Sequence, residues 1–488
     1  MKWGNARTLR REGDSEAVQC MEGNTDSTQR LGTAMAEAGK PSSETDTAEE
    51  SSSDSVFTKL HRISEKAKQD LTLQFTSLAH LLTIEMLGEA YGRLRKDASP
   101  GIDGLTAQAY ERDLLGNLQD LHRRLREGQY RAQPVRRVYI EQEGKRRPLG
   151  IPALEDKIVQ KAVALVLEAI YEQDFLPCSY GYRPGRGAQD ALNAVFRAIV
   201  AGKVSYVLEV DIKGYFQNIV HEHLMTFLQR RIRDGRLLRL IGKWLHVGVL
   251  EDSRLLPVTQ GTTQGAVISP ILANVYLHYV LDEWMQTVVK PRLRGEMYLF
   301  RYADDFIVCF QYREDAERVV SVLRKRLGKY GLELSEEKTR LIAFGRVAEA
   351  TSQGQGQRKP ATFDFLGFTH ICARGRNGKF TVHVRTARKR LRRAMQHVAE
   401  WCHANRHLSV SAQHRMLARM LRGHYAYYGR RTNWHSLSQF FEFVKKSWRK
   451  WLGRRTQQGR LSWSAYVALM GRYPLPKPHV VHGGAWVV

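Results

Sequence analysis

Two short apolar runs flank a pair of adjacent carboxylates, and this arrangement constrains the fold more than any other part of the sequence. The runs 297–300 and 306–310 enclose Tyr302-Ala303-Asp304-Asp305. Two such runs separated by a few polar residues predict a β-hairpin. Adjacent carboxylates at a strand tip repel each other unless a cation lies between them, and Mg²⁺ is a hard cation that prefers oxygen ligands. Taken alone, however, so short a pattern is more typical of a solvated turn.

A second stretch, upstream, favours the metal interpretation. Residues 207–210 form an apolar run that ends at Asp211, and a glycine and the aromatic residue Phe216 follow. A strand-borne aspartate together with a hairpin pair is what two-metal phosphoryl transfer requires, since one metal activates the attacking 3′-oxygen and the other stabilises the leaving pyrophosphate. The sequence therefore predicts Asp211, Asp304 and Asp305 as catalytic residues.

Further motifs follow one another along the chain in a recognisable order. They are Arg147 to Pro152, Tyr180 to Arg186, Asp211 to Phe216, Gln264-Gly265 with Ser269-Pro270, Tyr302 to Asp305, Phe365 to Phe368 and Leu421 to Tyr425. With these motifs the chain resembles the reverse transcriptases encoded by bacterial group II introns, the intron-encoded maturases, over roughly residues 75 to 480. We find no zinc-linked HNH endonuclease pattern, so the resemblance is to the endonuclease-lacking type.

The resemblance implies an α+β right-hand polymerase with fingers and an antiparallel palm, followed by a helical thumb and maturase domain. It implies a tail over 1–56, an N-terminal extension and fingers over 57–205, a palm over 206–370 and a thumb with the RNA-binding region over 371–488. The reverse transcriptase domain as a whole would span about 120–368. Two Mg²⁺ ions would be held by Asp211 and Asp304, with the Ile212 carbonyl assisting and Asp305 adjacent.

The same resemblance implies a set of nucleotide-binding residues: Lys145, Arg147, Phe216, Gln264, Gly265 and Lys338. Cations near the triphosphate neutralise its developing charge, and a ring under the sugar excludes a ribose 2′-OH by steric clash. Phe216 as a core residue and Lys338 as a surface lysine remain alternatives. The chain departs from the family pattern at Gln217, at Thr263 and at Glu141-Gln142, where relatives carry a lysine.

Positive charge is concentrated at the C-terminal end. The net charge is +26, and from Ile371 onward there are 24 basic and 2 acidic residues. A cationic block of this kind favours a polyanionic partner, here nucleic acid, over a generally basic surface. From Arg385 the apolar spacing predicts three amphipathic helices in a thumb-like bundle. The residues expected to bind RNA are Arg385, Arg388, Lys389, Arg392, Lys445, Lys446, Arg449, Lys450, Arg454 and Arg455.

The N-terminal region, the cysteines and the lengths of the apolar runs give further expectations. Residues 1–56 are polar and acidic and are expected to be a disordered tail. From Phe75 helical spacing appears and continues to Leu94. The five cysteines form no CxxC pair and no run is apolar enough to span a membrane, so a bacterial cytoplasmic protein associated with the nucleoid is expected.

These observations favour an RNA-directed DNA polymerase whose partners are group II intron RNA, an RNA template, a DNA primer and dNTPs, while the oligomeric state stays open. One alternative is a domesticated, defence or repair reverse transcriptase without an intron, for which the genomic context discriminates. Another is a splicing cofactor that no longer polymerises, and Gln217, Thr263 and the missing lysine keep it open.

Overall fold

The computed structural model describes residues 55–142, 145–251, 254–256, 260–348, 361–455, 459 and 461–482. The chain divides into two compact units. Unit 1 comprises Met1–Gly187, Ile212–Val288 and Val322–Leu334, and unit 2 comprises Ala188–Asp211, Val289–Ser321 and Ser335–Val488. Neither unit is therefore one continuous stretch of sequence.

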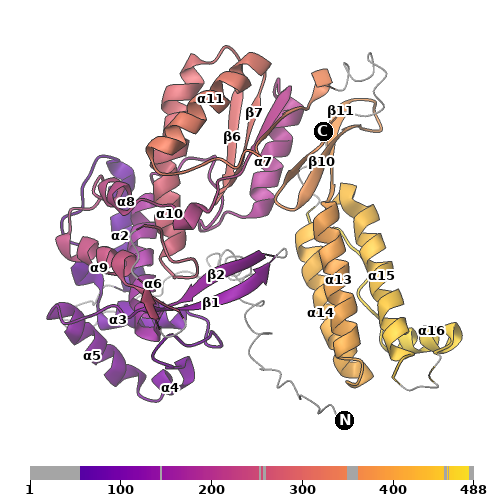
Figure 1. Cartoon of the computed structure of the whole chain (residues 1–488), viewed down its shortest axis with the longest axis horizontal. Helices are drawn as coiled ribbons and strands as arrows, with labels where there is room; N and C mark the ends of the chain where they lie inside the picture. The colour runs from indigo at the N-terminus through magenta and orange to yellow at the C-terminus, as the bar shows by residue number, and fades with distance from the viewer. Residues whose placement is uncertain are drawn as a thin grey trace, which may run out of the picture. The chain divides into compact units, whose positions relative to one another are not determined.

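Unit 1 is built around α6 (Leu154–Tyr171), which is apolar on most of its surface. Its residues Ile158, Val159, Ala162, Val163 and Val166 are fully buried, as predicted. Helices α2 (Val56–Gln69) and α3 (Ile84–Gly92) pack against α6. A helix that is apolar nearly all round is stable only inside a protein, so α6 forms the core onto which the rest of unit 1 folds (Figure 1).

The other helices of unit 1 are short and lie around this core. They are η2 (Ala79–Leu81), α4 (Ala107–Glu111), α5 (Leu114–Arg126), η3 (Tyr215–Gln217), α8 (His221–Leu228), α9 (Gly235–His246), α10 (Ser269–Leu277) and the π-helical η4 (His278–Asp282). A four-stranded sheet in the order β2-β1-β4-β5 completes unit 1. Its strands are β1 (Val135–Gln142), β2 (Lys145–Ile151), β4 (Val249–Glu251) and β5 (Arg254–Leu256). The pair β1–β2 is the predicted antiparallel hairpin, whereas β1 and β4 are parallel.

Unit 2 contains an antiparallel sheet in the order β6-β7-β3-β8. Its strands are β3 (Tyr206–Val210), β6 (Met297–Tyr302), β7 (Asp305–Phe310) and β8 (Arg340–Ala343). Helix α7 (Ala188–Ala201) packs along β6 (Figure 1). Strand β7 is buried from Phe306 to Phe310, which explains why its sequence is a continuous apolar run rather than an alternating one. Helix η6 (Lys290–Arg292) also belongs to unit 2, whereas η5 (Met285–Val289) and α11 (Arg313–Lys329) are each divided between the two units.

The C-terminal part of unit 2 begins with a small sheet in the order β11-β10-β9. Its strands are β9 (Phe363–Phe365), β10 (Phe368–Arg374) and β11 (Phe380–Thr386). Three long helices follow, α13 (Arg388–Ala404), α14 (Val410–Tyr428) and α15 (Trp434–Leu452), with η7 (Arg431–Asn433) before the last and α16 (Trp463–Arg472) after it. The predicted apolar stripes meet in one core that includes Leu391, Val398, Leu421 and Trp448.

Buried Arg430 fastens this bundle to α7. Its guanidinium donates to Gln189 Oε1 at 2.5 Å and to Asn193 Oδ1 at 3.0 Å. Gln189 Nε2 in turn donates to the Tyr427 carbonyl at 2.8 Å. Because buried polar groups are costly unless hydrogen-bonded, this network fixes the C-terminal end of α14 against α7.

Some predicted elements differ in the structure. The helix predicted from Phe75 begins only at Ile84, because the Thr83 side chain caps it by accepting from the Met86 amide. Arg385 lies in β11 and not in a helix. Of the predicted tail over 1–56, residues 1–54 lie outside the described residues, whereas Ser55 caps α2 and Val56 begins it. No helix within the described ranges is long and apolar enough to cross a membrane.

Candidate active site

Three carboxylates lie at one end of the central sheet of unit 2. Strands β3 and β7 pair so that Val210 lies opposite Phe306, and Asp211 and Asp305 are the next residues beyond that pair. Strands β6 and β7 form the predicted hairpin, in which Tyr302 pairs with Asp305 and Asp304 lies in the two-residue turn between them. Strand pairing therefore brings together residues that are far apart in sequence, and we call Asp211, Asp304 and Asp305 the carboxylate edge.

The turn that carries Asp304 has a strained backbone. Ala303 has a φ of 57°, in the left-handed region, which costs a residue with a Cβ about 1–2 kcal/mol. The fully buried Arg301 donates from Nη1 to the Ala303 carbonyl at 3.0 Å and so holds the turn. Backbone strain of this kind persists where the surrounding structure imposes it, and it occurs often at functional sites.

The carboxylates influence one another electrostatically. Protein atoms packed around the Asp305 carboxyl disfavour its charged form, and the negative charges of Asp304 and Asp211 add repulsion, so the pKa of Asp305 is raised to about 7. The Asp305 side chain nevertheless remains open to solvent. A cation at this edge would relieve the repulsion.

One cation of the protein already contacts this edge. Lys338 Nζ donates to both carboxylate oxygens of Asp211 at 3.0 Å. The two side chains are 62% and 40% exposed, so the pair lies on the surface and is accessible. In this structure the predicted nucleotide-binding lysine therefore contacts a predicted metal ligand.

The donor set of the edge suits Mg²⁺. Carboxylate oxygens are hard ligands, and Mg²⁺ is commonly held by one or two of them together with substrate phosphates. Within the described ranges, no three acidic, histidine or cysteine side chains converge into a complete metal site made by protein alone.

Other predicted nucleotide-binding residues come together within unit 1. The Gly150 amide of β2 donates to the Gln264 carbonyl at 2.8 Å, and the Thr262 amide donates to the Phe216 carbonyl at 2.7 Å. The loop 261–268 thus joins the strand of Arg147 to the short helix η3 of Phe216. Phe216 is half-buried and Arg147 is exposed, whereas the side chain of Lys145 lies outside the described residues.

Gly265 allows this close approach. It has a φ of 106°, and a Cβ at this position would lie 2.7 Å from the Gly150 carbonyl oxygen. A glycine is required here because the backbone is left-handed and there is no space for a side chain.

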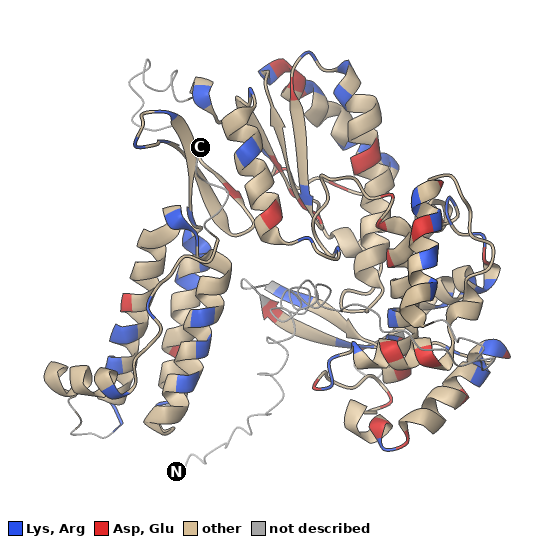
Figure 2. Cartoon of the chain, turned by 180° about the vertical axis from the view of Figure 1, so that it is seen from behind, with Lys and Arg blue, Asp and Glu red and all other residues tan. Residues whose placement is uncertain are grey.

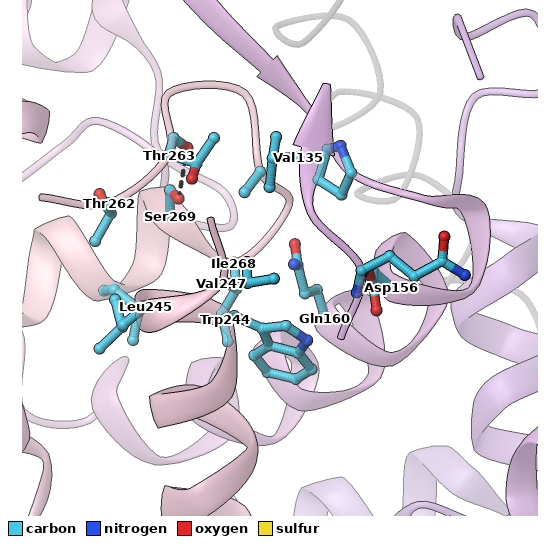
Figure 3. Close-up of a pocket in the computed structure, with 14 residues that line it drawn as sticks. Val135, Asp156, Gln160, Trp244, Leu245, Val247, Thr262, Thr263, Ile268 and Ser269 are labelled. Carbon is cyan, nitrogen blue, oxygen red and sulfur yellow. Dashed lines mark hydrogen bonds between the residues drawn. The ribbon is translucent and has the colours of Figure 1, made fainter. Parts of the chain in front are cut away.

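A small cavity lies beneath the same loop (Figure 3). Its volume is about 10 Å³, which is close to the space needed for one water molecule, so it is too small for a substrate. Ser269 Oγ donates to the Thr263 carbonyl at 2.9 Å and the Val267 amide donates to Gln160 Oε1 at 3.1 Å. Asp156 lines the cavity, and burial raises its pKa to about 6. These contacts support the loop from below.

Apart from Arg385, which lies in β11, the predicted RNA-binding cations lie on and after the helices of the C-terminal bundle (Figure 2). Arg388, Lys389 and Arg392 are on α13, and Lys445, Lys446, Arg449 and Lys450 are on α15, with Arg454 and Arg455 after it. Lys445 is neutralised by Glu442 at 3.0 Å, and Arg455 donates to the Leu408 carbonyl at 2.6 Å. The structure therefore does not make these cations equivalent.

The sequence did not reveal two features, one at the carboxylate edge and one beside the C-terminal bundle. Arg301 holds the turn of Asp304, and no pattern in the sequence marks it. Trp463 begins α16, a helix that was not predicted, although Ser462 is a typical N-cap residue and accepts from the Ala465 amide.

Comparison with known proteins places this chain in a family. The family model described as reverse transcriptase (RNA-dependent DNA polymerase) matches residues 139–370. The group II intron-encoded protein LtrA of Lactococcus lactis subsp. cremoris is 35% identical over 295 residues, which are 58% of this chain and 47% of that protein. The chain thus spans about half the length of that relative.

Two further relatives are similar. Protein YkfC of Escherichia coli (strain K12) is 33% identical over 311 residues, which are 56% of this chain and 81% of that protein. Nuclear intron maturase 4, mitochondrial, of Arabidopsis thaliana is 25% identical over 157 residues, which are 32% of this chain and 19% of that protein. The region matched by the family model, residues 139–370, includes all three residues of the carboxylate edge. The chain belongs to the reverse transcriptase family, among its group II intron-encoded members.

Proposed function

We propose that this protein is an RNA-directed DNA polymerase of a group II intron, which copies an RNA template into DNA from a DNA primer and dNTPs. The observation that carries the proposal is the carboxylate edge, where strand pairing joins Asp211 to the hairpin of Asp304 and Asp305. A protein that only binds RNA has no physical need for three carboxylates at one end of a sheet, where Asp304 and Asp211 help to raise the pKa of Asp305.

Two Mg²⁺ ions would be held by Asp211 and Asp304, with the Ile212 carbonyl assisting and Asp305 beside them. When bound, they would supply activation of the primer 3′-oxygen and stabilisation of the leaving pyrophosphate. The raised pKa of Asp305 supports a site that needs positive charge. Lys338 would leave Asp211 as the ions bind and would then neutralise charge on the pyrophosphate.

The other proposed nucleotide-binding residues are Arg147, Phe216, Gln264 and Gly265. Arg147 would contact the triphosphate, and the ring of Phe216 would exclude a ribose 2′-OH. Gln264 and Gly265 would offer backbone groups close to the nucleotide, which is supported by their tight contact with Gly150. The cavity beneath the loop 261–268 is too small for the loop to move into it. The backbone groups of Gln264 and Gly265 would therefore keep their positions before substrate binds.

Polymerase subdomains are named after the parts of a right hand. Residues 57–205 would form the N-terminal extension and fingers, and residues 206–370 would form the palm. Residues 371–488 would form the thumb and an RNA-binding maturase region. The sheet β6-β7-β3-β8 supports the palm assignment, and the helices α13, α14 and α15 with their common core support the thumb assignment.

The intron RNA would be the partner of the C-terminal bundle, where binding would assist splicing and mobility. The excess of basic over acidic residues after Ile371 supports this assignment, because phosphate contacts dominate nucleic-acid affinity. Structured RNA is recognised by its shape, by its phosphates and by stacking of its bases on aromatic side chains. The bundle has basic side chains that can contact phosphates, and Trp434 and Trp463 are exposed aromatic side chains.

Primer extension tests the proposed function. The purified protein is given a DNA primer annealed to an RNA template, with dNTPs and Mg²⁺, and full-length DNA is expected. The same preparation is assayed for splicing of its intron RNA. Splicing without any extension would replace the polymerase by a splicing cofactor.

A further inference from the structure

Helix α16 follows α15 at one end of the C-terminal bundle (Figure 1). A pocket lies where α15 ends and α16 begins. Its volume is about 360 Å³, within the range of roughly 300–1,000 Å³ that is usual for sites of small molecules. Tyr466 of α16 donates to the Lys445 carbonyl at 2.9 Å, which holds the two helices together. The lining residues are Lys446, Arg449, Lys450, Gly453, Arg454, Gly459, Leu461 and Trp463.

The described lining of this pocket is positively charged. Among the lining residues that the structure describes, four side chains are cations and none is an acid. The carboxylate on α15, Glu442, is already bound to Lys445. In the part of the chain that the structure describes, Lys446, Arg449, Lys450 and Arg454 form no ion pair with a carboxylate. A concave cluster of unneutralised cations attracts phosphate.

Arg449 is the most constrained of these cations. Its Nη2 donates to the Leu461 carbonyl at 3.3 Å, and its guanidinium lies 4.8 Å from the centroid of the Trp463 ring. Its Nε is buried without a hydrogen-bond partner among the described residues. A buried donor without a partner is costly, and a phosphate oxygen in the pocket would satisfy it.

Trp463 adds an aromatic surface to the same pocket. The Ser462 side chain caps α16 and fixes the position of Trp463 at its first turn. About half of Trp463 is exposed (49%), although it is a large apolar residue. Nucleobases stack on such rings with little sequence preference, and arginine contributes cation–π attraction.

From these contacts we propose that the pocket binds one unstacked nucleotide of a single-stranded RNA segment. The base stacks on Trp463, and its phosphate is held by Arg449 with Lys446, Lys450 and Arg454. A duplex cannot use the pocket in this way, because its bases are stacked and paired and only its phosphates face outward. This inference rests on the proposed function, in which the bundle binds RNA, and adds that the contact selects unpaired RNA.

The test compares RNA affinities of the full chain by fluorescence anisotropy. The probes are a short single-stranded RNA, a duplex RNA of the same length and a single-stranded DNA of the same sequence as the first. The variant Trp463→Ala is expected to bind the single-stranded RNA about tenfold more weakly, from the usual strength of base–aromatic stacking. Its affinity for the duplex is expected to change by less than about twofold, and Trp463→Phe is expected to retain most of the single-strand affinity.

The chain offers a matched control in Trp434, which is 51% exposed and begins α15 at its other end. Trp434→Ala should leave the single-strand preference unchanged. A second readout uses 2-aminopurine in the single-stranded RNA, whose fluorescence should be quenched by the wild type and less by Trp463→Ala.

Three results would overturn the inference: equal losses on single strand and duplex, an equal loss in Trp434→Ala, or dependence on Trp463 for DNA but not for RNA. Failure of the proposed function looks different, because the wild type would then bind neither RNA probe and would extend no primer.

Discussion

The carboxylate edge and the C-terminal bundle both belong to unit 2, and each gathers charge of one sign, but they do so by opposite means. The edge joins Asp211 to the hairpin of Asp304 through strand pairing, and the pKa of Asp305 is raised there. The cations of α15 are neighbours in sequence and lie on the surface of a helix. Carboxylates brought together by strand pairing can share the same metal ions, whereas cations spread along a helix surface are screened from one another by water and salt. The edge should therefore act as a unit, and the bundle as a sum of small contributions.

Asp304→Ala should produce the largest effect. If the edge acts as a unit, losing one carboxylate removes metal binding, and primer extension should fall by at least about 1,000-fold. RNA affinity, measured by filter binding, should change by less than about twofold, because this carboxylate serves the metals and not the RNA. Extension above a few per cent of wild type would show that the edge does not act as a unit.

Phe216→Ala tests the part of the site that lies outside the edge. Without the ring, a ribose 2′-OH meets no obstacle, and the preference for dNTP over rNTP should fall by roughly 10- to 100-fold in single-nucleotide incorporation. The rate with dNTP should fall much less than in Asp304→Ala. An unchanged preference would mean that sugar selection resides elsewhere.

The bundle should respond in a graded way. Neutralising Arg449, Lys450, Arg454 and Arg455 to glutamine should reduce the slope of log affinity against log salt by up to about 3 to 4 units, since each phosphate contact contributes roughly −0.7 to −0.9. Single substitutions should each give only part of this change, and the parts need not be equal, because Arg455 already donates to the Leu408 carbonyl. Splicing should suffer more than extension on a short primer–template, and equal losses would identify the region as a polymerase thumb only.

Lys338→Gln should have the smallest effect. The ion pair of Lys338 with Asp211 is exposed on both sides, and such pairs contribute about 0.2–1 kcal/mol. Removing the lysine should therefore strengthen binding of Mn²⁺ by about 1.5- to 5-fold, measured by electron paramagnetic resonance without substrate. Weaker Mn²⁺ binding would show that the lysine organises the edge instead of competing at it.

The same contrast explains what could be predicted from sequence. The hairpin of Asp304 is encoded locally by its two apolar runs, and the helices of the bundle by their apolar stripes, so both were predicted. The strands over 371–386 were missed, although Val382 and Val384 alternate with more exposed residues in β11, because the basic residues nearby suggested the start of a helix.

Features that depend on tertiary contacts could not be predicted. Lys338 reaches Asp211 through a turn in which the Ser335 amide donates to the Asp211 carbonyl at 2.8 Å, and nothing in the local sequence specifies that pairing. The pocket of Trp463 likewise depends on how α16 folds back onto α15. Residues 75–81 are apolar at helical spacing but pack mainly in irregular structure before the cap at Thr83.

The most direct test of separate roles is single-turnover primer extension with RNA raised until every variant is saturated. The account predicts that the variant with Arg449, Lys450, Arg454 and Arg455 neutralised regains a rate close to that of the wild type, because only its binding is weakened. Asp304→Ala should remain without measurable extension at any RNA concentration. Extension by Asp304→Ala, or a defect of the neutralised variant that saturation does not relieve, would contradict the assignment of catalysis to the carboxylate edge and of RNA binding to the bundle.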